Sequence, residues 1–443
     1  MATAPTIYAL SSGAGVAGVA VIRISGPAVG VIVERLRLGK LRPRVAHRVH
    51  IADPLSGEFI DDGLALLFPA PASYTGEDVL ELHVHGGRAV VAAILAALSR
   101  IDGCRPAEAG EFTRRAFHNG KLDLTEAEGL ADLIAAETEA QRRQALRVAA
   151  GGLRDLYEGW RAQLIDAMAL MEAALDFSDE ADVAADTINQ ARLRITALRP
   201  QIAAHLNDGR RGEILRDGLK VVIAGPPNAG KSSLLNALAR RAVAIVSPEP
   251  GTTRDVVEAR LDLGGYPVIV SDTAGIRRQP AGEIEREGIR RSFARSAEAD
   301  LVLWLIDATA PEIKPPHELL DQGAAIVSVL NKIDLAKPHG IDALAAISTK
   351  TGEGLPGLLE LIGARAAGRL DSGDAPLITT ARQRALIEDA GRALDDYLAG
   401  SLALPELRAD DLRRAAQSLG RVTGRVDAED VLSQVFGAFC IGK

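Results

Sequence analysis

The chain is poor in cysteine and in aromatic residues. Its 443 residues include two cysteines, Cys104 and Cys440, and 3% aromatic residues. Two cysteines exclude a disulfide framework, which favours the reducing cytoplasm as the setting. No uncharged apolar stretch is long enough to span a bilayer, and the first residues, Met-Ala-Thr-Ala-Pro, have neither the basic nor the apolar region of a signal peptide. We therefore expect a cytoplasmic protein without a membrane span.

The chain also lacks an excess of positive charge. Its net charge of −8 and pI near 5.6 argue against non-specific binding of nucleic acid by the whole surface. Such binding would need a local basic patch or a partner protein. One basic run, Arg413, Arg414, Arg421 and Arg425, fits a solvated helix face better than a contact with nucleic acid. The length predicts two to four domains, because a single core rarely exceeds roughly 250 residues.

Residues 1–120 have the pattern of an α+β domain. Strand-like segments at Val19–Ile24, Leu64–Phe68 and Val79–Val84 are separated by turns rich in glycine and proline. A helical run follows at Ala89–Leu98. Together these segments predict an independent domain at the start of the chain.

One strand of this domain has a polar face. Alternation along Val79–His85 puts Glu81, His83 and His85 on one side and apolar residues on the other. The polar side could form a wall of a binding site. A His-x-His pair suggests a metal, but no acidic or cysteine partner has ligand spacing, so structural histidines are the preferred interpretation.

A helical region follows the first domain. Thr125-Glu-Ala-Glu128 is predicted to be a capping box, and periodicity rich in alanine and leucine continues to about Leu206. Breaks are expected at Gly151-Gly152 and along Asp176–Asp182, because glycines and clustered aspartates favour turns. We assign residues 121–212 to the first part of an all-α domain.

Helical periodicity returns near the end of the chain, along Ala381–Leu398 and Leu407–Phe439. We assign residues 372–443 to the second part of the same all-α domain, with Ser372–Pro376 as the linker that returns to it. Residues 213–371 would then be an inserted domain, which is tolerated because domain termini usually lie close together.

The inserted domain begins with a phosphate-binding loop. The apolar strand Val221–Ala224 runs into Gly225-Pro-Pro-Asn-Ala-Gly-Lys-Ser232, and a helix-like Leu234–Leu238 follows. Backbone N–H groups at a helix N-terminus attract phosphates, and the second glycine lets the backbone approach them. The lysine can place its charge on the β- and γ-phosphates, and the serine hydroxyl can coordinate Mg²⁺.

Four further motifs follow in the order of a guanine-nucleotide-binding domain. Pro250–Asp255 supplies switch-type hydroxyls, and Asp272–Gly275 follows a strand and can reach the Mg²⁺ shell and the γ-phosphate. Asn331–Asp334 ends another strand, and its aspartate can accept two N–H bonds from guanine. Ser348–Lys350 would close over the base. Each motif alone is weak, but this order after a phosphate-binding loop predicts a GTPase.

The predicted fold class is therefore multidomain, with an N-terminal α+β domain, a discontinuous all-α helical domain and an inserted α/β Ras-like P-loop GTPase domain. The predicted GTP site consists of Asn228, Ala229, Gly230, Lys231, Ser232, Ser233, Ser247, Pro248, Glu249, Pro250, Gly251, Thr252, Thr253, Asp272, Thr273, Ala274, Gly275, Asn331, Lys332, Asp334, Ser348, Thr349 and Lys350.

The residue that orients the catalytic water is not evident from these motifs. Ras-like enzymes place a glutamine directly after the DxxG motif, but Ile276 stands there in this chain. Arg277 and Arg278 come next, and Glu285 lies on a helix-like segment further on. Taken alone, Glu285 fits a solvated helix carboxylate.

The whole chain resembles one family, the tRNA modification GTPases MnmE, also called TrmE. The resemblance rests on Val21–Gly26, Tyr74–Asp78, Phe117–Leu124, Gly251–Asp255 and the final Phe439–Lys443. A GTPase domain inserted in a helical domain, with a C-terminal Cys-x-Gly-Lys, is specific to this family.

The resemblance implies a cytoplasmic enzyme that acts with a FAD- and NADH-dependent MnmG-like partner. The two would add a carboxymethylaminomethyl or aminomethyl group to carbon 5 of the wobble uridine, U34, of certain tRNAs. The resemblance also implies a homodimer, a heterotetramer with that partner, and 5,10-methylene- or 5-formyl-tetrahydrofolate as one-carbon donor. Family contacts to folate fall on Arg23, Glu81, Lys121 and Lys443. Charged groups of this kind suit folate carboxylates and the N–H groups of a pterin.

The resemblance also implies a hydrolytic mechanism. Family members are activated by K⁺, which bridges the phosphates and draws two GTPase domains together. Its ligands fall on Asn228, Ser247, Glu249 and Thr252, and Mg²⁺ falls on Ser232 and Thr253. Glu285 then becomes the residue that orients water. Cys440 fits a buried small hydrophobe, or a role near the modification site as a catalytic residue.

Two other functions stay open at this stage. An Era-like ribosome-assembly GTPase would share the GTPase motifs, but it predicts a basic RNA-binding module that this sequence lacks, and it leaves Arg23, Glu81 and Lys121 unexplained. A folate-binding protein with a purely regulatory GTPase is the second. Analysis of wobble-uridine products in a deletion strain would separate it from the main hypothesis.

Overall fold

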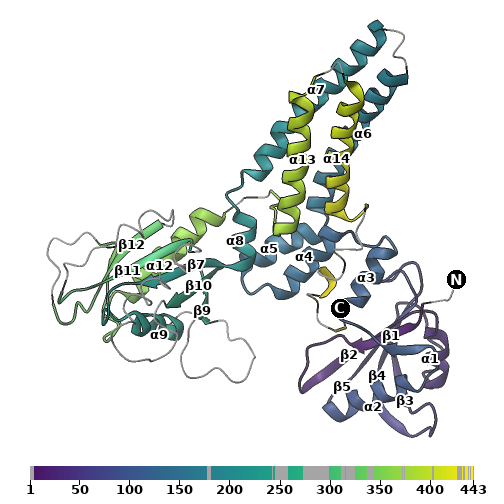
Figure 1. Ribbon diagram of the computed structural model, residues 1–443. Helices are drawn as coiled ribbons and strands as arrows, with labels where there is room; N and C mark the ends of the chain where they lie inside the picture. The colour runs from purple at the N-terminus through teal and green to yellow at the C-terminus, as the bar shows by residue number, and fades with distance from the viewer. Residues whose placement is uncertain are drawn as a thin grey trace, which may run out of the picture. The chain divides into compact units, whose positions relative to one another are not determined.

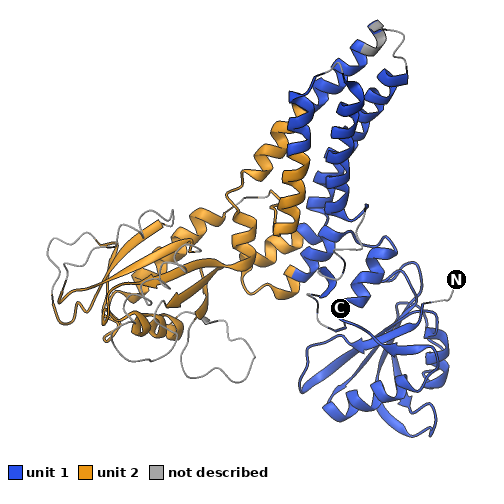
Figure 2. Ribbon diagram, viewed as in Figure 1, with its two compact units in different colours: residues 1–131, 148–196, 392–443 blue, residues 132–147, 197–391 orange. Residues whose placement is uncertain are grey.

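The computed structural model describes most of the chain (Figure 1). The described residues are 4–176, 181–241, 243–244, 258–272, 299–310, 315, 325–336, 343–371, 373, 375–401, 404–426, 432, 435–437, 439 and 441–442. Two compact units are present (Figure 2). The first comprises residues 1–131, 148–196 and 392–443, and the second comprises residues 132–147 and 197–391.

A six-stranded sheet organises the start of the first unit, in the order β3-β4-β5-β2-β1-β6. Its strands are β1 (Thr6–Leu10), β2 (Ala17–Ser25), β3 (His47–Ala52), β4 (Phe59–Phe68), β5 (Val79–Gly86) and β6 (Cys104–Pro106). Neighbours pair antiparallel except β1 and β6, which are parallel. All three predicted strands are confirmed, within β2, β4 and β5.

The pleat of β5 separates apolar from polar residues as predicted. Leu80, Leu82 and Val84 are buried, whereas the alternate residues Glu81 and His83 are partly exposed and His85 is exposed. Three helices complete the domain: α1 (Val29–Arg35), α2 (Arg88–Ser99) and α3 (Glu111–His118). The predicted helix at Ala89–Leu98 is confirmed within α2, whose buried residues belong to the same apolar cluster as β2 and β5. Burial of this one face holds the helix on the sheet.

Helices make up the middle and the end of the chain. They are α4 (Leu124–Ala135), α5 (Glu139–Ala149), α6 (Gly152–Asp176), α7 (Ala181–Leu206), α13 (Ala381–Ala399) and α14 (Pro405–Thr423). Within the first unit, α6 packs along α14, and the Tyr397 hydroxyl of α13 donates to Met171 Sδ at 3.7 Å. The break at Gly151-Gly152 is confirmed, since α5 ends at Ala149 and α6 begins at Gly152. Of the second predicted break, Asp176–Asp182, residues 177–180 lie outside the described residues, and α7 begins at Ala181.

Two helix boundaries differ from the prediction. The capping box of α4 is formed by Asp123 and Glu126 and not by Thr125 and Glu128, because the Glu126 N–H donates to Asp123 Oδ1 (2.7 Å) and the Asp123 N–H donates to Glu126 Oε2 (2.8 Å). Burial raises the pKa of Asp123 to about 6, although the hydrogen bonds it accepts oppose this. The predicted helix Leu407–Phe439 is also wrong as one element, since α14 ends at Thr423 before a left-handed Gly424 (φ 80).

The second unit is built around a seven-stranded sheet with the order β13-β12-β11-β7-β10-β9-β8. Its strands are β7 (Leu219–Ala224), β8 (Val243–Ala244), β9 (Glu258–Leu263), β10 (Tyr266–Asp272), β11 (Leu301–Asp307), β12 (Ala325–Asn331) and β13 (Ala345–Ala346). The neighbouring strands β13, β12, β11, β7 and β10 pair in parallel. Strand β9 pairs antiparallel with both of its neighbours, β10 and β8. The helices α8 (Arg211–Asp217), α9 (Lys231–Arg241) and α12 (Leu355–Leu370) belong to the same unit.

The central strand of this sheet is apolar on both faces, as its sequence suggested. Four consecutive residues, Val221 to Ala224, are buried. A strand that is covered on both faces has a continuous apolar sequence. The carboxyl ends of neighbouring parallel strands lie along the same edge of the sheet. The predicted multidomain fold class is confirmed, with an α+β domain, a discontinuous helical domain and an inserted α/β domain.

Candidate functional site

The loop between β7 and α9 needs residues that accept a left-handed backbone. Gly225 (φ 151), Asn228 (φ 63) and Gly230 (φ 99) all have positive φ values. A Cβ atom on Gly230 would lie 2.4 Å from Asn331 Nδ2, and one on Gly225 would lie 2.6 Å from the Leu305 carbonyl oxygen. Both positions therefore require glycine, which has no Cβ.

The side chains of Lys231 and Asp272, of opposite charge, lie near one another where this loop joins α9. Lys231 Nζ donates to the carbonyls of Gly225 (3.0 Å) and Pro226 (2.9 Å), and the Ser232 hydroxyl donates to Asp272 Oδ2 at 2.5 Å. Burial lowers the pKa of Lys231, and the nearby Asp272 opposes this. A hydroxyl beside a carboxylate is a suitable oxygen set for Mg²⁺, and an ammonium beside a helix N-terminus suits phosphate. The residues present therefore fit a nucleotide with its metal.

Asn331 connects the phosphate-binding loop to the loop predicted to cover the base. It is fully buried at the end of β12. Its Nδ2 donates to the Ala229 carbonyl (2.8 Å), and its Oδ1 accepts from the Thr349 N–H (3.1 Å). The Ser348 hydroxyl donates to Asp334 Oδ1 at 2.7 Å. Three motifs that are far apart in the sequence thus share one hydrogen-bonded cluster, beside which Ser233 and Lys350 are exposed.

Asp307, which was not among the predicted site residues, pairs with the lysine of the Asn-Lys-x-Asp motif. Asp307 ends β11 in register with Asn331, and its Oδ2 lies 2.5 Å from Lys332 Nζ. Burial alone would raise the pKa of Asp307, but hydrogen bonds from Lys332 and Thr309 outweigh it and lower the pKa. The signal was present in the sequence, because an aspartate that ends a strand beside the Asn331 strand must lie at the same edge of the sheet.

Several predicted site residues lie outside the described residues. For the GTP site these are Ser247, Pro248, Glu249, Pro250, Gly251, Thr252, Thr253, Thr273, Ala274 and Gly275. The predicted catalytic residues Glu285 and Cys440 and the predicted folate contact Lys443 lie outside them as well. Of the predicted ion ligands, the structure therefore describes Asn228 for K⁺ and Ser232 for Mg²⁺.

A second polar site lies on the sheet of the N-terminal domain. Arg23 of β2 and Glu81 of β5 are cross-strand neighbours, and Arg23 Nε and Nη2 each lie 2.9 Å from Glu81 Oε1. The Arg23 guanidinium also lies 5.2 Å from the ring centroid of Tyr74 and 5.8 Å from that of Phe112. A donor fork beside an acceptor carboxylate suits a planar ligand with both kinds of group along one edge.

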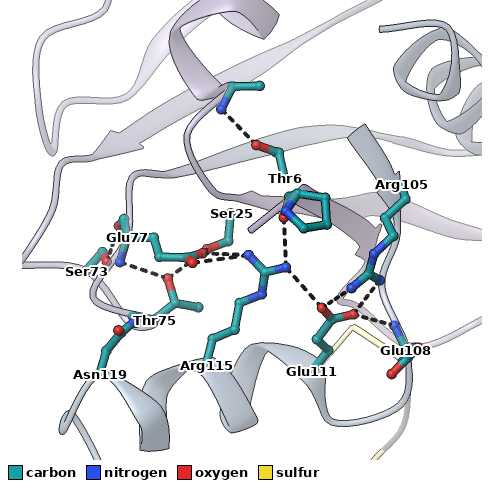
Figure 3. Close-up of polar contacts among 12 residues, drawn as sticks. Thr6, Ser25, Ser73, Thr75, Glu77, Arg105, Glu108, Glu111, Arg115 and Asn119 are labelled. Atoms are coloured by element: carbon teal, nitrogen blue, oxygen red, sulfur yellow. Dashed lines mark hydrogen bonds and ion pairs between the residues drawn. The ribbon is translucent and has the colours of Figure 1, made fainter. Parts of the chain in front are cut away.

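Tyr74 belongs to a loop, residues 70–78, that is tied to α3. The Tyr74 hydroxyl lies 2.8 Å from Thr113 Oγ1, and Asn119 Nδ2 donates to the Thr75 carbonyl at 2.7 Å. In Figure 3, the Glu77 carboxylate and the Arg115 guanidinium point toward one another. Arg115 Nη1 donates to both Glu77 oxygens at 3.0 and 3.1 Å. These bonds fix the loop that carries the aromatic ring over Arg23.

Arg115 also binds a second carboxylate, that of Glu111. Its Nη2 donates to Glu111 Oε1 (3.0 Å) and to the Pro5 carbonyl (2.8 Å), and Arg105 donates to both Glu111 oxygens at 2.6 and 2.8 Å (Figure 3). Burial alone would raise the pKa of Glu111, but the hydrogen bonds from Arg105, the Glu108 N–H and Arg115 lower it to about 2. The network is thus a partly buried chain of alternating charges in which the Glu111 carboxylate stays ionised.

Lys121 does not contact Arg23 or Glu81. Its Nζ donates to the carbonyl of Pro71, at the start of the same loop, at 3.0 Å. The C-terminal tail reaches this domain too, since Ile441 forms a bridge with Ala109 and the Ser11 hydroxyl donates to the Gly442 carbonyl at 2.7 Å. The described neighbours of Cys440 and Lys443 therefore lie against the N-terminal domain.

The two histidines of β5 have carboxylate neighbours. His85 Nδ1 lies 2.8 Å from Asp61 Oδ1, and His83 Nε2 lies 3.5 Å from Glu81 Oε2. Within the described ranges, no group of three or more His, Cys, Asp or Glu side chains is arranged to hold a metal. None of the helices there combines the length and the apolarity needed to cross a bilayer.

The arginine run near the C-terminus is largely neutralised. Three of its members pair with carboxylates: Arg413 with Glu172 at 3.7 Å, Arg414 with Asp396 at 3.2 Å and Arg425 with Glu158 at 2.6 Å. These pairs agree with a solvated helix face and weaken the case for nucleic acid binding there.

Comparison with known proteins identifies the family to which this chain is similar. The family model described as MnmE helical domain matches residues 124–440, and the one described as GTP-binding protein TrmE N-terminus matches residues 6–121. The tRNA modification GTPase MnmE of Parvibaculum lavamentivorans is 52% identical over 448 residues, covering 99% of this chain and all of that protein. That of Rhodopseudomonas palustris strain CGA009 is 52% identical over 446 residues, covering 99% of each.

Among solved structures, a variant of Aquifex aeolicus Era bound to GDP and AlF₄⁻ is similar in part. It is 26% identical and covers 42% of this chain and 69% of its own, with a TM-score of 0.26. A score that low adds nothing to the family matches.

Proposed function

The chain belongs to the MnmE family of tRNA modification GTPases, and from this membership we propose how its two sites divide the work. The protein is a GTP hydrolase that acts in tRNA modification. We propose that the inserted domain binds and hydrolyses GTP, while the N-terminal domain binds the one-carbon donor. The product would be a carboxymethylaminomethyl or aminomethyl group on carbon 5 of the wobble uridine of certain tRNAs.

One observation carries the GTP site: the buried Asn331 that bonds both to the phosphate-binding loop and to the base loop. This amide makes the positions of phosphates and base depend on one another. In the proposed complex, Lys231 leaves its two carbonyl partners for the β- and γ-phosphates, and Asp334 accepts N–H bonds from guanine. The remaining predicted GTP-site residues are proposed from the sequence motifs to which they belong.

The proposed ions follow the oxygen ligands available. Ser232 and Thr253 would hold Mg²⁺, which neutralises phosphate charge, with Asp272 in its outer shell. Asn228, Ser247, Glu249 and Thr252 would hold K⁺. Asn228 supports this set, because its left-handed conformation (φ 63) places an amide-bearing residue within the phosphate-binding loop. Glu285 would orient the attacking water in place of the missing glutamine.

The proposed folate site uses the Arg23–Glu81 pair. A pterin carries a carbonyl and N–H groups along one edge, which match the guanidinium donors and the carboxylate acceptor. Tyr74 and Phe112 flank the guanidinium with apolar surface. Lys121 and Lys443 would meet the carboxylates of the folate tail, and Cys440 would lie near the modified uridine. We propose 5,10-methylene- or 5-formyl-tetrahydrofolate as the ligand.

The proposed assembly is a cytoplasmic homodimer that joins a FAD- and NADH-dependent MnmG-like protein in a heterotetramer. K⁺ would draw the two GTPase domains of the dimer together in each cycle of hydrolysis. The proposal leaves the oxidation chemistry to the flavin of the partner.

Potassium dependence tests the hydrolytic part of the proposal. GTP turnover by the purified chain is measured in KCl and in NaCl at equal ionic strength, for the wild type, Asn228→Ala and Glu285→Ala. We expect marked stimulation by K⁺ that is lost in Asn228→Ala, and a turnover that collapses in Glu285→Ala. Equal rates of the wild type in both salts would remove the K⁺ mechanism and leave a GTPase of another type.

Analysis of tRNA tests the modification itself. In a strain that lacks the gene, nucleoside mass spectrometry should show loss of the modified wobble uridine, and the wild-type gene should restore it. An unchanged wobble uridine would favour the alternatives, an Era-like ribosome-assembly switch or a folate-binding protein with a regulatory GTPase. Accumulation of ribosome precursors would then identify the first of these.

A further inference from the structure

An exposed basic segment, residues 35–48, runs from the end of α1 to the first residues of β3 (Figure 1). It contains Arg35, Arg37, Lys40, Arg42, Arg44 and Arg48, and no aspartate or glutamate. All six cations are exposed. This is a local concentration of positive charge on a chain whose net charge is −8.

The basic segment differs from the arginine run of α14 in its partners. Arg48 pairs with Asp62 at 3.2 Å, and Arg44 donates to the Ala72 carbonyl and lies over the Phe68 ring. The other four cations, Arg35, Arg37, Lys40 and Arg42, have no carboxylate partner within the described ranges. Unpaired exposed cations keep their whole charge for a partner, whereas paired ones do not.

Arg37 occupies the left-handed position after α1, which is usually glycine in helices that end in this way. The Arg37 N–H donates to the Glu34 carbonyl (3.1 Å) and the Leu38 N–H donates to the Val33 carbonyl (3.0 Å), which is the Schellman pattern at the end of α1. Arg37 itself has a φ of 57. This left-handed conformation costs an arginine about 1 kcal/mol more than a glycine. The backbone alone would therefore favour glycine, and what the arginine adds is its side chain, whose exposed guanidinium lies beside Gly57.

The basic segment is connected to the site that contains Arg23. Arg44 bonds to the carbonyl of Ala72, which adjoins Pro71, the residue whose carbonyl accepts from Lys121. Both belong to the loop of residues 70–78, which carries Tyr74 over Arg23. A polyanion bound along the segment would thus lie on the same domain as the proposed one-carbon site and share a loop with it.

We propose that residues 35–42 of the basic segment bind the phosphate backbone of the substrate tRNA. This inference rests on the proposed function, which makes tRNA the substrate. Regularly spaced phosphates are the chemistry that several unpaired exposed cations recognise, and each contact adds affinity by releasing counterions. The segment supplies positioning and not sequence recognition, because phosphate contacts carry no base information.

The test compares two variants of the full-length protein with the same change in charge. Arg37→Gly combined with Arg42→Gln alters the segment, and Arg194→Gln combined with Arg365→Gln removes two exposed arginines from α7 and α12. The probe is an unmodified transcript of a tRNA with uridine at the wobble position. Binding is measured by filter retention or fluorescence anisotropy from low to physiological salt.

We expect about tenfold weaker binding at low salt for the Arg37→Gly, Arg42→Gln protein, with a salt slope smaller by roughly two, one for each lost contact. The control should bind as the wild type does. The melting temperature of the first variant should stay the same or rise, because glycine relieves the strain at position 37. Weaker binding with unchanged or raised stability excludes loss of folding as its cause.

Three outcomes would overturn the proposal: unchanged affinity in the Arg37→Gly, Arg42→Gln protein, an equal loss in both variants, or a loss that follows a lowered melting temperature. Failure of the proposed function itself looks different. In that case, the wild type would neither bind the transcript nor be needed for the wobble modification.

Discussion

The two sites hold their cations in different ways. In the nucleotide site, the Lys231 ammonium donates to two backbone carbonyls and is surrounded by residues with positive φ, so backbone conformation shapes the site. In the N-terminal domain, Arg115 lies between the carboxylates of Glu77 and Glu111, so side-chain charges shape it. The first site should therefore fail when a Cβ is added, and the second when a charge is removed.

The largest effect is expected from Arg115→Ala. Arg115 is 9% exposed and its loss leaves Glu77 and Glu111 without a shared partner, which should destabilise the N-terminal domain by roughly 3–5 kcal/mol. Hydrogen exchange of the amides of α3 should become correspondingly faster. The control is Arg114→Ala on the same helix, whose partly exposed pair with Glu108 (3.0 Å) should contribute less than about 1 kcal/mol. Equal losses of stability in Arg115→Ala and Arg114→Ala would contradict the role of Arg115 as the shared partner of the two carboxylates.

The charge network should also make this domain sensitive to acid. The pKa of Glu111 is about 2 in the folded protein, against 4.5 for the free side chain. A lowered pKa contributes stability above pH 4.5, and the contribution disappears as the pH falls from 4.5 to about 2. Each pKa unit corresponds to about 1.4 kcal/mol, so the Glu111→Gln substitution should lower the free energy of unfolding by about 3 kcal/mol at neutral pH.

The measurement is urea unfolding of wild type and Glu111→Gln between pH 7 and pH 2. The difference in unfolding free energy between the two should shrink toward zero at the acid end. A difference independent of pH would show that the carboxylate contributes through shape and not through its charge.

In the nucleotide site, the Gly230→Ala substitution should have the corresponding damaging effect, because it adds a Cβ where the backbone leaves no room. An added Cβ would displace the Asn331 amide, from which it would be 2.4 Å away, and strain a residue at φ 99. We expect about hundredfold weaker GTP binding, or roughly 2–3 kcal/mol, in an equilibrium titration. Gly264→Ala is the matched control, because Gly264 has a φ of 66 but no atom within 4 Å of an added Cβ. It should lower stability by about 1 kcal/mol and leave GTP affinity unchanged.

The same difference explains how much could be predicted from the sequence. The clustering of residues at the proposed nucleotide site was predictable because they come in short motifs at the ends of parallel strands, where topology brings them together. Asn331 and Ser348 were expected to lie in one cluster for this reason, but Asp307 belongs to no motif and was missed. Glu81 was placed on a polar face by alternation alone, and family resemblance grouped it with Arg23 as a folate contact, but the ion pair between the two was not predicted.

The contacts around Arg115 could not be predicted at all. They join residues on a loop, a helix and two strands at sequence separations that no period relates, and their register depends on the folded domain. The two helix errors have local causes. Asp123 and Thr125 are both good caps, and only the hydrogen bonds decide between them. Gly424 ends α14 inside a periodic stretch, where its neighbour Leu124 leaves no room for a Cβ.

The smallest effect is expected at the aromatic ring over Arg23, where neither backbone strain nor an ion pair is removed. Tyr74→Leu takes away the ring 5.2 Å from the guanidinium, an interaction of about 1 kcal/mol. If the ring holds Arg23 in place for the one-carbon donor, 5-formyl-tetrahydrofolate should bind about fivefold more weakly in calorimetry. Tyr74→Phe keeps the ring and loses only the hydroxyl contact with Thr113, so its affinity should stay near that of the wild type. A fivefold loss in Tyr74→Phe as well would assign the effect to the anchoring of the loop and remove the ring from the site. In that event the N-terminal site would depend on its hydrogen-bonded network alone, and the contrast with the backbone-shaped nucleotide site would become sharper.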